Sequence, residues 1–478
     1  MDKARIVVVG GGPGGYTAAF YAADLGMDTV LIDTEPAPGG VCVWRGCIPS
    51  KALLHAAHTV ALAREAEAYG VKFAEPTIDL AALRAWKDRV VGKLTGGTAQ
   101  LAKLRKIRSV QGRATLLGPN KLEVKKVDGT TDTLEFEHCV LATGSRPVRL
   151  PFLPDSPKVW DSSAALELRE IPKRLVVLGG GYIGMEMATV YGTLGSEVTV
   201  VEMTPGLLPG CDRDLVVPLA KRAEKLCRGG VLLDTKITAV KDEGGILKVT
   251  MENKDGAQTR EFDALLYSVG RKPNSDSIGL DKTKVQTNKN GFIQVDLARR
   301  TAEPSIFAIG DVAGQPMLAH KASHEGRTAV DAASGKKAAF EPQAIPAVVF
   351  TDPEIATCGL SETQAAVEGK VVEVARFSWG ASGRSQTLGR TDGMTKLVID
   401  PATERVLGVG IVGPGAGELI AEGTLAVEMG ARASDLALTI HAHPTLSETV
   451  MEAAEMFFGH CTHAYRPKKP AAPAPAKP

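Results

Sequence analysis

The chain has 478 residues, 44% hydrophobic and 23% charged, which suits a globular protein of two to four domains. Its 56 lysines and arginines nearly balance its 55 aspartates and glutamates, so neither nucleic acid nor a membrane is expected as a partner. No stretch approaches the roughly 18 uninterrupted apolar residues of a membrane helix. The opening MDKARIVVVGGG does not resemble a secretory signal, and the seven cysteines are mostly scattered. We therefore expect a cytoplasmic protein.

The first predicted elements occur twice in the chain. RIVVVGGGPGGYTAAFYAADLGMDTVLID (5–33) matches RLVVLGGGYIGMEMATVYGTLGSEVTVVE (174–202) without a gap. Each copy predicts a buried strand, a G-x-G-x-x-G turn, a helix and a second strand that ends in an acidic residue. The residues that carry this pattern are Gly10, Gly12, Gly15 and Asp33 in the first copy and Gly179, Gly181, Gly184 and Glu202 in the second.

This pattern is typical of a dinucleotide-binding unit. The glycines let the backbone approach a pyrophosphate, the helix N-terminus stabilises its charge, and the acid accepts hydrogen bonds from ribose hydroxyls. Two tight turns in an ordinary α/β sheet are the alternative, which the repetition of the whole pattern disfavours. Glu202 would repel a 2′-phosphate, and no arginine follows it in EMTPGLLPG. We expect one dinucleotide per copy, with NAD preferred over NADP in the second.

Two cysteines, Cys42 and Cys47, lie close together in GGVCVWRGCIPSK. In a regular helix, residues five apart are separated by about 7.5 Å of rise, beyond the roughly 7 Å Cα limit of a disulfide. A bond between them needs a distorted segment, for which Gly46 supplies the freedom. Pro49 predicts a helix that begins near Cys47, where the dipole and Lys51 favour a thiolate. A redox-active disulfide is favoured over a structural disulfide or a zinc half-site.

The cysteine pair and the two dinucleotide units together indicate a path for electrons. A disulfide does not readily take hydride directly from nicotinamide, so a flavin is expected between them. Cys42 follows Asp33 by only a few residues, which favours FAD in the first copy and NAD in the second.

The sequence after residue 240 predicts further strands, and its pattern changes near residue 342. Residues 240–300 predict strands joined by hairpin turns, including NKNGFIQVD (288–296). A strand at SIFAIGD (305–311) precedes a helix over MLAHKASHEGRTAVDAA (317–333). From about residue 342 the pattern indicates antiparallel strands and then helices, which is typical of an α+β domain.

Several motifs together resemble the FAD-dependent pyridine nucleotide–disulfide oxidoreductase family over residues 3 to about 463. The matching motifs are VGGGPGGYTAA, CVWRGCIPSKALLH, LATGSRP, LGGGYIGMEMA, VGRKPN, IFAIGDV, MLAHKA, FTDPEIATCG and HAHPTLSE. CIPSKALLH and HAHPTLSE point to the branch that oxidises dihydrolipoamide. The resemblance implies an α/β fold with two Rossmann-like dinucleotide-binding domains plus an α+β C-terminal dimerisation domain.

The resemblance also implies domain boundaries. These are 1–148 for the first part of an FAD-binding domain, 149–271 for an NAD-binding domain, 272–341 for a central segment that returns to the FAD-binding domain, and 342–465 for a C-terminal dimer-interface domain. Residues 466–478 lie beyond the resemblance, and their proline-, alanine- and lysine-rich composition predicts a disordered tail.

Site roles follow from the same resemblance. It implies that Cys42 is the interchange thiol and Cys47 the charge-transfer thiol against the flavin, with His443 as acid/base and Glu448 orienting its ring. Lys51, paired with Glu186, is expected near the reactive edge of the flavin, and Asp311 at its ribitol chain. Tyr182 either covers the nicotinamide pocket or packs in the core. The expected cofactor-binding residues are Gly10, Gly12, Gly15, Asp33, Lys51, Gly144, Asp311, Gly179, Gly181, Gly184, Glu186, Glu202 and Gly270, and no metal ligand is expected.

The residues alone leave the role of His443 open. An imidazole can deprotonate a dithiol near neutral pH. TLSE (445–448) also fits a capping box, in which Glu448 would only cap a helix. The family resemblance favours catalysis for His443 and a structural role for His441.

Two departures from the family pattern flank the first cysteine. Val41 and Trp44 stand where Thr and Asn are usual, but both thiols remain, so we expect these two changes to leave the chemistry of the family intact.

The reaction that the resemblance implies is dihydrolipoamide + NAD⁺ → lipoamide + NADH + H⁺. Its substrate is expected on the lipoyl domain of a 2-oxoacid dehydrogenase complex or on a glycine cleavage protein. A homodimer is implied, with the base supplied by the partner. The alternatives are a glutathione reductase-, mercuric reductase- or transhydrogenase-like enzyme, or a non-catalytic flavoprotein scaffold.

Overall fold

The computed structural model describes residues 2–465, and the chain divides into two compact units. Unit 1 comprises Met1–Pro205 and Cys227–Glu341, and unit 2 comprises Gly206–Leu226 and Pro342–Pro478. The expected tail, 466–478, lies outside the described residues. The finer division into domain segments stays a prediction.

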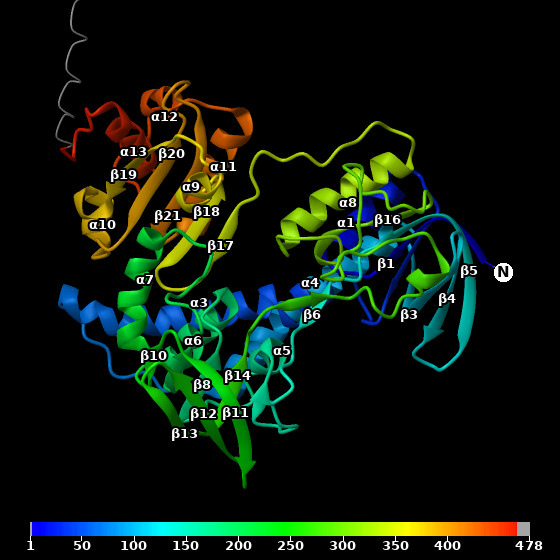
Figure 1. The fold of residues 1–478 in the computed structure, drawn as a ribbon, viewed down its shortest axis with the longest axis horizontal. Helices are drawn as coiled ribbons and strands as arrows, with labels where there is room; N and C mark the ends of the chain where they lie inside the picture. Colours follow the sequence, from blue (N-terminus) through cyan, green and yellow to red (C-terminus); the bar gives the residue numbers. More distant parts are fainter. Residues whose placement is uncertain (1, 466–478) are drawn as a thin grey trace, which may run out of the picture. The chain divides into compact units, whose positions relative to one another are not determined.

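The first half of unit 1 is built on a six-stranded sheet in the order β1-β2-β3-β4-β5-β16, in which β5 also pairs with β1. Its strands are β1 (Asp2–Val9), β2 (Thr29–Asp33), β3 (Arg108–Gly118), β4 (Lys121–Lys126), β5 (Thr131–Leu141) and β16 (Ile306–Ala308). β1 pairs in parallel with β2 and β5, whereas β4 is antiparallel to β3 and β5. Helices α1 (Pro13–Asp24) and α8 (Ala319–Ala333) lie side by side against β1 (Figure 1). Their small apolar faces pack on the sheet in one buried core.

The second half of unit 1 contains a five-stranded sheet in the order β10-β9-β8-β14-β7, all parallel. Its strands are β7 (Val159–Trp160), β8 (Arg174–Leu178), β9 (Glu197–Val201), β10 (Gly230–Leu232) and β14 (Ala264–Tyr267). Helix α6 (Tyr182–Leu194) follows β8, and α5 (Ser162–Leu166) follows β7. From Gly184 to its end α6 is buried throughout, which explains its almost wholly apolar sequence.

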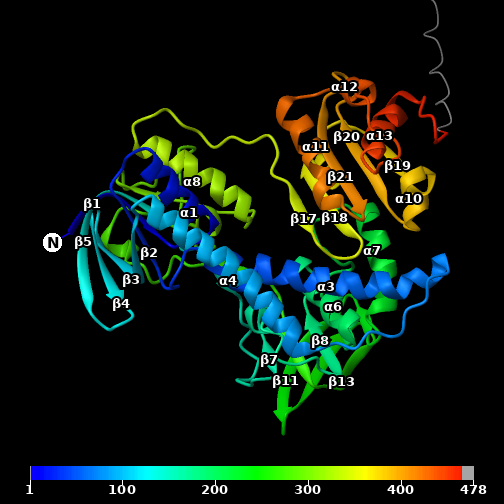
Figure 2. The same ribbon diagram turned by 180° about the vertical axis from the view of Figure 1, so that it is seen from behind.

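Two smaller sheets and two long helices complete unit 1. An antiparallel sheet is formed by β11 (Lys236–Glu243), β12 (Ile246–Asn253) and β13 (Gly256–Phe262). A short ladder pairs β6 (Ser145–Pro147) with β15 (Arg271–Pro273). The remaining elements are α2 (Gly40–Arg45), α3 (Cys47–Glu65), η1 (Ala66–Tyr69), α4 (Leu80–Leu104), η2 (Leu280–Lys282) and η3 (Gly310–Val312). Seen from behind in Figure 2, α3 runs beside α6 and contacts α4.

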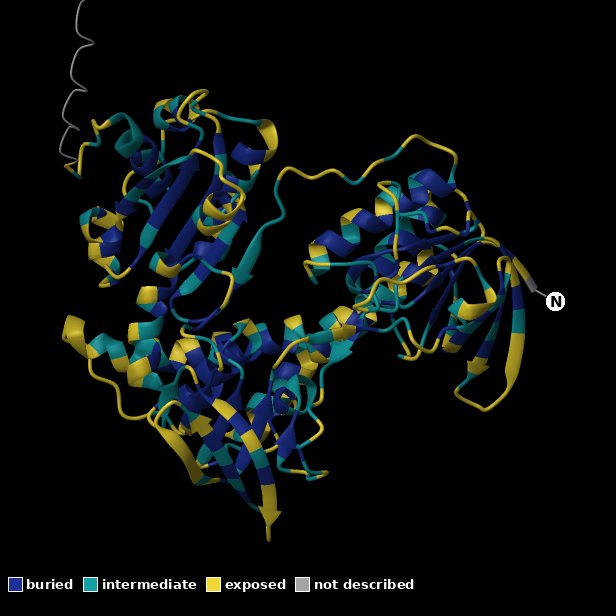
Figure 3. Cartoon of the chain, in the orientation of Figure 1, coloured by how far each residue is buried: buried dark blue, intermediate teal, exposed yellow. Residues whose placement is uncertain are grey.

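Unit 2 is an antiparallel sheet covered by helices. The sheet order is β17-β18-β21-β20-β19, with β17 (Ala347–Val349), β18 (Glu354–Gly359), β19 (Glu373–Ser378), β20 (Met394–Ile399) and β21 (Val406–Gly413). Its helices are α7 (Arg213–Leu226), α9 (Glu362–Val367), η4 (Trp379–Ala381), α10 (Gly383–Leu388), α11 (Ala416–Met429), α12 (Ala433–Leu438) and α13 (Glu448–Phe458). The strands are mostly buried, as the dark blue ribbon of Figure 3 shows. The expected α/β halves and the α+β C-terminal part are thus confirmed.

One strand prediction is wrong. NKNGFIQVD forms only an isolated bridge between Thr287 and Ile293. The N–H of Asn288 donates to the Phe292 carbonyl and that of Gln294 to the Gln286 carbonyl, so a short hairpin turn forms. The N–H of Ile293 donates to the Val312 carbonyl instead, and the ladder does not extend into a strand. None of the helices within residues 2–465 combines the length and the apolar composition that a bilayer span requires.

Candidate functional site

A cavity of about 740 Å³ in unit 1 connects the first glycine turn with the cysteine pair. Ten of the residues singled out from the sequence line it: Gly10, Gly12, Gly15, Asp33, Cys42, Cys47, Lys51, Gly144, Glu186 and Asp311. The fold therefore gathers segments from both ends of unit 1 around one space. Gly179, Gly181, Gly184, Glu202 and Gly270 are not part of its wall.

The two glycine turns have the same local structure. Gly10 and Gly179 both have φ of +106°, a backbone conformation that favours glycine. A Cβ at Gly15 would lie 1.8 Å from the Gly10 carbonyl oxygen, and one at Gly184 would lie 2.0 Å from that of Gly179. No larger side chain fits at either position, so each helix begins directly against the end of its strand.

The two expected acids close these turns in the same way. The Asp33 carboxylate accepts a hydrogen bond from the Gly11 N–H. Glu202 Oε2 accepts from the Gly180 N–H at 2.7 Å, and its Oε1 accepts from Thr204 at 2.8 Å. Each acid therefore stands at the carboxyl end of its second strand beside the turn, where a ribose binds in dinucleotide units.

The cavity fits FAD. Gly12 and Gly40 face each other so closely that a Cβ on Gly40 would lie 2.4 Å from the Gly12 Cα, so backbone alone forms the wall where a pyrophosphate would approach. The N-terminus of α1 faces this part of the cavity and favours negative charge. Asp33 and Asp311 supply carboxylates for hydroxyl groups farther along.

The redox segment is interrupted where the sequence indicates. Helix α2 ends at Arg45, Gly46 leaves helical geometry, and α3 begins at Cys47. A Cβ on Gly46 would lie 2.8 Å from the Val41 carbonyl oxygen, so the break requires glycine. The side chains of Cys42 and Cys47 lie within hydrogen-bonding reach of each other.

The two thiols differ sharply in acidity. A hydrogen bond between their side chains, together with burial, raises the pKa of Cys42. The same hydrogen bond lowers the pKa of Cys47 to about 7; burial opposes this change and the nearby Lys51 ammonium assists it. Lys51 Nζ donates to both carboxylate oxygens of Glu186 at 3.0 Å, which is the expected pairing. These shifts favour the proton on Cys42 and the negative charge on Cys47.

We expect Lys51→Met to raise the pKa of the Cys47 thiol above 7. The thiolate loses the positive charge of Lys51, while the negative charge of Glu186 remains and repels it. The measurement is the pH dependence of ultraviolet thiolate absorbance in the reduced protein. Burial raises the pKa of Cys139, Cys211, Cys227, Cys358 and Cys461, so Cys47 alone titrates near neutrality. The exposed Lys93→Met is the control; equal curves for both variants would contradict the role of Lys51.

In unit 2 the structure brings His443 and Glu448 together. His443 Nδ1 lies 2.8 Å from Glu448 Oε1, and the imidazole is largely exposed. Glu448 Oε2 accepts from the Thr445 N–H at 2.7 Å. Burial opposes ionisation of Glu448, but the Thr445 N–H and His443 hold its pKa below the usual value. The carboxylate thus caps the backbone with one oxygen and orients the imidazole with the other, which leaves Nε2 available.

His441 is engaged on both sides. Its Nε2 lies 2.7 Å from Glu422 Oε1 and its Nδ1 lies 2.8 Å from the Thr439 carbonyl oxygen. With both nitrogens bonded and the side chain buried, it suits the structural role expected for it. Tyr182, by contrast, is exposed and lines the cavity, so it does not pack in the core. Burial raises the pKa of its hydroxyl, and Arg271 partly opposes the shift.

Ser145 and Arg271 were not among the residues expected at the site, although they lie in the motifs LATGSRP and VGRKPN. Both line the cavity beside Asp311. The signal available was position: each directly follows a glycine expected at the site, Gly144 or Gly270.

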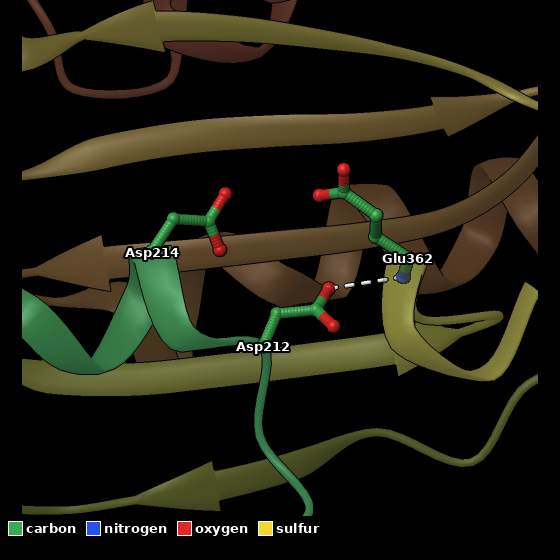
Figure 4. Close-up of side chains that lie close together, drawn as sticks. All are labelled: Asp212, Asp214 and Glu362. Carbon is green, nitrogen blue, oxygen red and sulfur yellow. Dashed lines mark hydrogen bonds between the residues drawn. The ribbon is translucent and has the colours of Figure 1, made fainter. Parts of the chain in front are cut away.

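Unit 2 also contains a cluster of three carboxylates, from Asp212, Asp214 and Glu362 (Figure 4). Their spacing would suit a cation, but the buried Lys396 ammonium already lies 2.6 Å from Asp212 and 2.8 Å from Asp214. Arg376 binds Asp214 and Glu362 from the other side. Two protein cations already pair with the three carboxylates, and we assign the cluster a structural role.

We expect Lys396→Met to destabilise unit 2 by about 3 to 5 kcal/mol, because it leaves the buried Asp212 carboxylate without its cation. The check is denaturant unfolding followed in both variants. The matched control is Lys248→Met, which removes an exposed pair with Glu243 and should leave the unfolding midpoint nearly unchanged. Equal losses in the two variants would refute the structural role.

Comparisons with known proteins agree with this geometry. A model of the pyridine nucleotide-disulphide oxidoreductases matches residues 4–326, and a model of the dimerisation domain of these enzymes matches residues 345–454. The chain therefore belongs to the pyridine nucleotide-disulphide oxidoreductase family. The fold class and enzyme class expected from the sequence are confirmed.

Several similar curated relatives are dihydrolipoyl dehydrogenases. Dihydrolipoyl dehydrogenases of Vibrio cholerae and Haemophilus influenzae are each 48% identical to this chain and cover 96% of it, over 97% and 96% of their own lengths. That of Thermus scotoductus is 47% identical and covers 97% of this chain and 99% of its own. Among solved structures, LpdA from Mycobacterium tuberculosis has a TM-score of 0.87 at 27% identity, covering 96% of this chain and 100% of its own.

Proposed function

We propose that this chain is an NAD-dependent dihydrolipoyl dehydrogenase. Its cofactors are FAD and NAD, and it oxidises a dihydrolipoyl group to the cyclic disulfide. The observation that carries this assignment is the Cys42–Cys47 pair on the wall of a dinucleotide-sized cavity, with Lys51 and its partner Glu186 on the same wall. The match to dihydrolipoyl dehydrogenases over nearly the whole chain supports the substrate.

The cavity residues would hold the flavin. The turn at Gly10, Gly12 and Gly15 and the N-terminus of α1 would bind the pyrophosphate, Asp33 the adenosine ribose and Asp311 the ribitol hydroxyls. When bound, FAD accepts the electron pair of the protein dithiol and delivers it as hydride to NAD⁺. The second glycine turn and Glu202 would bind the NAD.

The two cysteines exchange disulfides with the substrate. His443 removes a proton from one substrate thiol, and the resulting thiolate attacks Cys42 of the oxidised pair, breaking the S–S bond and releasing Cys47 as a thiolate. The second substrate sulfur then attacks the first, closes the lipoyl ring and expels Cys42, which takes the proton from His443. The second substrate proton leaves to solvent. The products on the protein are a Cys42 thiol and a Cys47 thiolate, the protonation state that the structure favours.

Lys51 and Glu186 support the charged product. The Lys51 ammonium stabilises the Cys47 thiolate, and Glu186 holds Lys51 through two hydrogen bonds. Because Glu186 is buried in α6, the position of Lys51 depends on the second dinucleotide-binding half.

The matched dimerisation domain supports a homodimer. We extend this to a site in which the partner supplies His443, with the lipoyl domain of a 2-oxoacid dehydrogenase complex or glycine cleavage protein as substrate carrier. The scattered cysteines and balanced charge support a cytoplasmic location.

A steady-state assay tests the assignment. Dihydrolipoamide, glutathione disulfide and Hg(II) are each offered with NAD(H) and NADP(H). We expect turnover with dihydrolipoamide and NAD⁺. Faster turnover with glutathione disulfide and NADPH would favour a glutathione reductase instead, and no turnover with any pair would favour a scaffold.

We expect Glu202→Arg to shift the coenzyme preference from NAD toward NADP. The substitution removes the ribose acceptor and introduces a cation for the 2′-phosphate. The ratio of kcat/KM with NAD to kcat/KM with NADP should fall by roughly tenfold or more in the variant. Glu197→Arg, at the opposite end of β9, is the matched control and should leave the ratio unchanged. An unaltered ratio in Glu202→Arg would count against Glu202 as the ribose ligand.

A further inference from the structure

Asp311 lies at the end of a chain of hydrogen bonds. Ser145 Oγ donates to Asp311 Oδ2 at 2.5 Å. Arg271 Nε donates to the same Ser145 Oγ at 2.7 Å, and Arg271 Nη2 donates to the Ser145 carbonyl oxygen at 2.7 Å. Ser145 is buried, and all three side chains line the cavity of unit 1.

Donor and acceptor roles in this chain are fixed by chemistry. A guanidinium can only donate, so Ser145 Oγ must accept from Arg271. The single hydroxyl proton of Ser145 is therefore directed to the Asp311 carboxylate, and a bond to an ionised acceptor is stronger than one between neutral groups. Within residues 2–465, Asp311 Oδ1 has no hydrogen-bond partner, so it stays open to a donor in the cavity.

The backbone beneath Asp311 is held separately. The N–H of Gly310 donates to Glu325 Oε2 at 2.6 Å. Glu325 is fully buried and bonds Arg299 and Lys321 at 3.0 Å each. This network positions η3 but does not contact the Asp311 side chain. The orientation of that carboxylate is left to Ser145.

We propose that Ser145 is a positioning residue for the flavin, holding the Asp311 carboxylate by Oδ2 so that Oδ1 accepts from a ribitol hydroxyl of FAD. The inference rests on the proposed role of Asp311. Arg271 completes the arrangement because its Nε donates to the Ser145 hydroxyl and fixes it. Arg271 lies on β15 and Ser145 on β6, and the ladder between these strands joins the two dinucleotide-binding halves. The affinity for FAD therefore depends on a residue of the second half that follows Gly270.

The test is a double-mutant cycle on FAD affinity. Wild type, Ser145→Ala, Asp311→Asn and the double variant are prepared as holoenzymes, and free FAD is quantified after dilution and ultrafiltration. We expect Ser145→Ala to raise the dissociation constant of FAD roughly tenfold to hundredfold, as for loss of a charge-assisted hydrogen bond. In the Asp311→Asn background the same substitution should have little effect, because Ser145 acts through the carboxylate.

The possible failures are distinguishable. If Asp311→Asn leaves FAD affinity unchanged, the proposed role of Asp311 fails. If Asp311→Asn weakens FAD binding, two outcomes would overturn the role of Ser145. In one, Ser145→Ala raises the dissociation constant of FAD by the same factor with and without Asp311; in the other, it leaves the dissociation constant unchanged in the wild-type background. Ser275→Ala is the matched control, since it also removes one hydroxyl bond, to the Gly291 carbonyl, without lining the cavity.

A second variant covers poor folding of Ser145→Ala. Arg271→Lys keeps the charge but removes the Nε donor that fixes the Ser145 hydroxyl. It should weaken FAD binding in the same direction, and only when Asp311 is present. An undiminished FAD affinity in Arg271→Lys would overturn the proposed chain.

Discussion

Cys47→Ser should lower dihydrolipoamide turnover by at least about a thousandfold while FAD remains bound. Serine is nearly isosteric, so the cavity keeps its shape, but its hydroxyl neither forms a disulfide nor ionises near pH 7. The loss therefore falls on electron transfer and not on cofactor binding. The measurements are steady-state turnover with NAD⁺ and the flavin content of the purified protein.

A titration separates the two thiols. The reduced wild type should show one thiolate that forms near pH 7, and this step should vanish in Cys47→Ser. Cys42→Ser should also abolish turnover yet keep a thiolate on Cys47, because the new hydroxyl can still donate to its sulfur. Cys211→Ser, in unit 2, is the control and should retain turnover. Appreciable turnover in Cys47→Ser would refute the dithiol mechanism.

His443→Gln is expected to reduce turnover by roughly a hundredfold to ten-thousandfold at pH 7, the range of general acid–base catalysis. The residual rate should rise steeply with pH, because the substrate dithiol then ionises without help. Glu448→Gln should cost less, since it weakens only the orientation of the imidazole and leaves the base in place. His460→Gln, which removes an exposed histidine beyond α13, should leave the rate unchanged. A wild-type pH profile in His443→Gln would exclude this residue as the base.

Mixed dimers test where His443 acts. Homodimers of Cys47→Ser and of His443→Gln should each have little activity. If the base comes from the partner, one site of their heterodimer carries both changes and the other site carries neither. A statistical mixture should then regain about a quarter of the wild-type turnover. If cysteines and base belong to the same chain, every site remains impaired and the mixture stays inactive.

Much of the site was predictable because its signals are local. The glycine turns at Gly10 and Gly179 follow from the conformations that only glycine adopts readily, and the break at Gly46 follows from the spacing of the two cysteines. The pairing of His443 with Glu448 spans five residues and was indicated by one motif. The strand expected over NKNGFIQVD stops at a single bridge, because the N–H of Ile293 bonds to the carbonyl of the distant Val312, which local spacing does not indicate.

The sequence by itself determined the chemistry available: two dinucleotide turns, a dithiol, and an imidazole with its carboxylate. These are properties of residue types at short spacing, where backbone geometry alone sets the outcome. Only the tertiary structure decided which segments share one cavity and how Asp311 is held. The hold on Asp311 depends on Ser145 and Arg271, residues far apart in the chain that hydrogen bonds bring together beside it only in the folded protein.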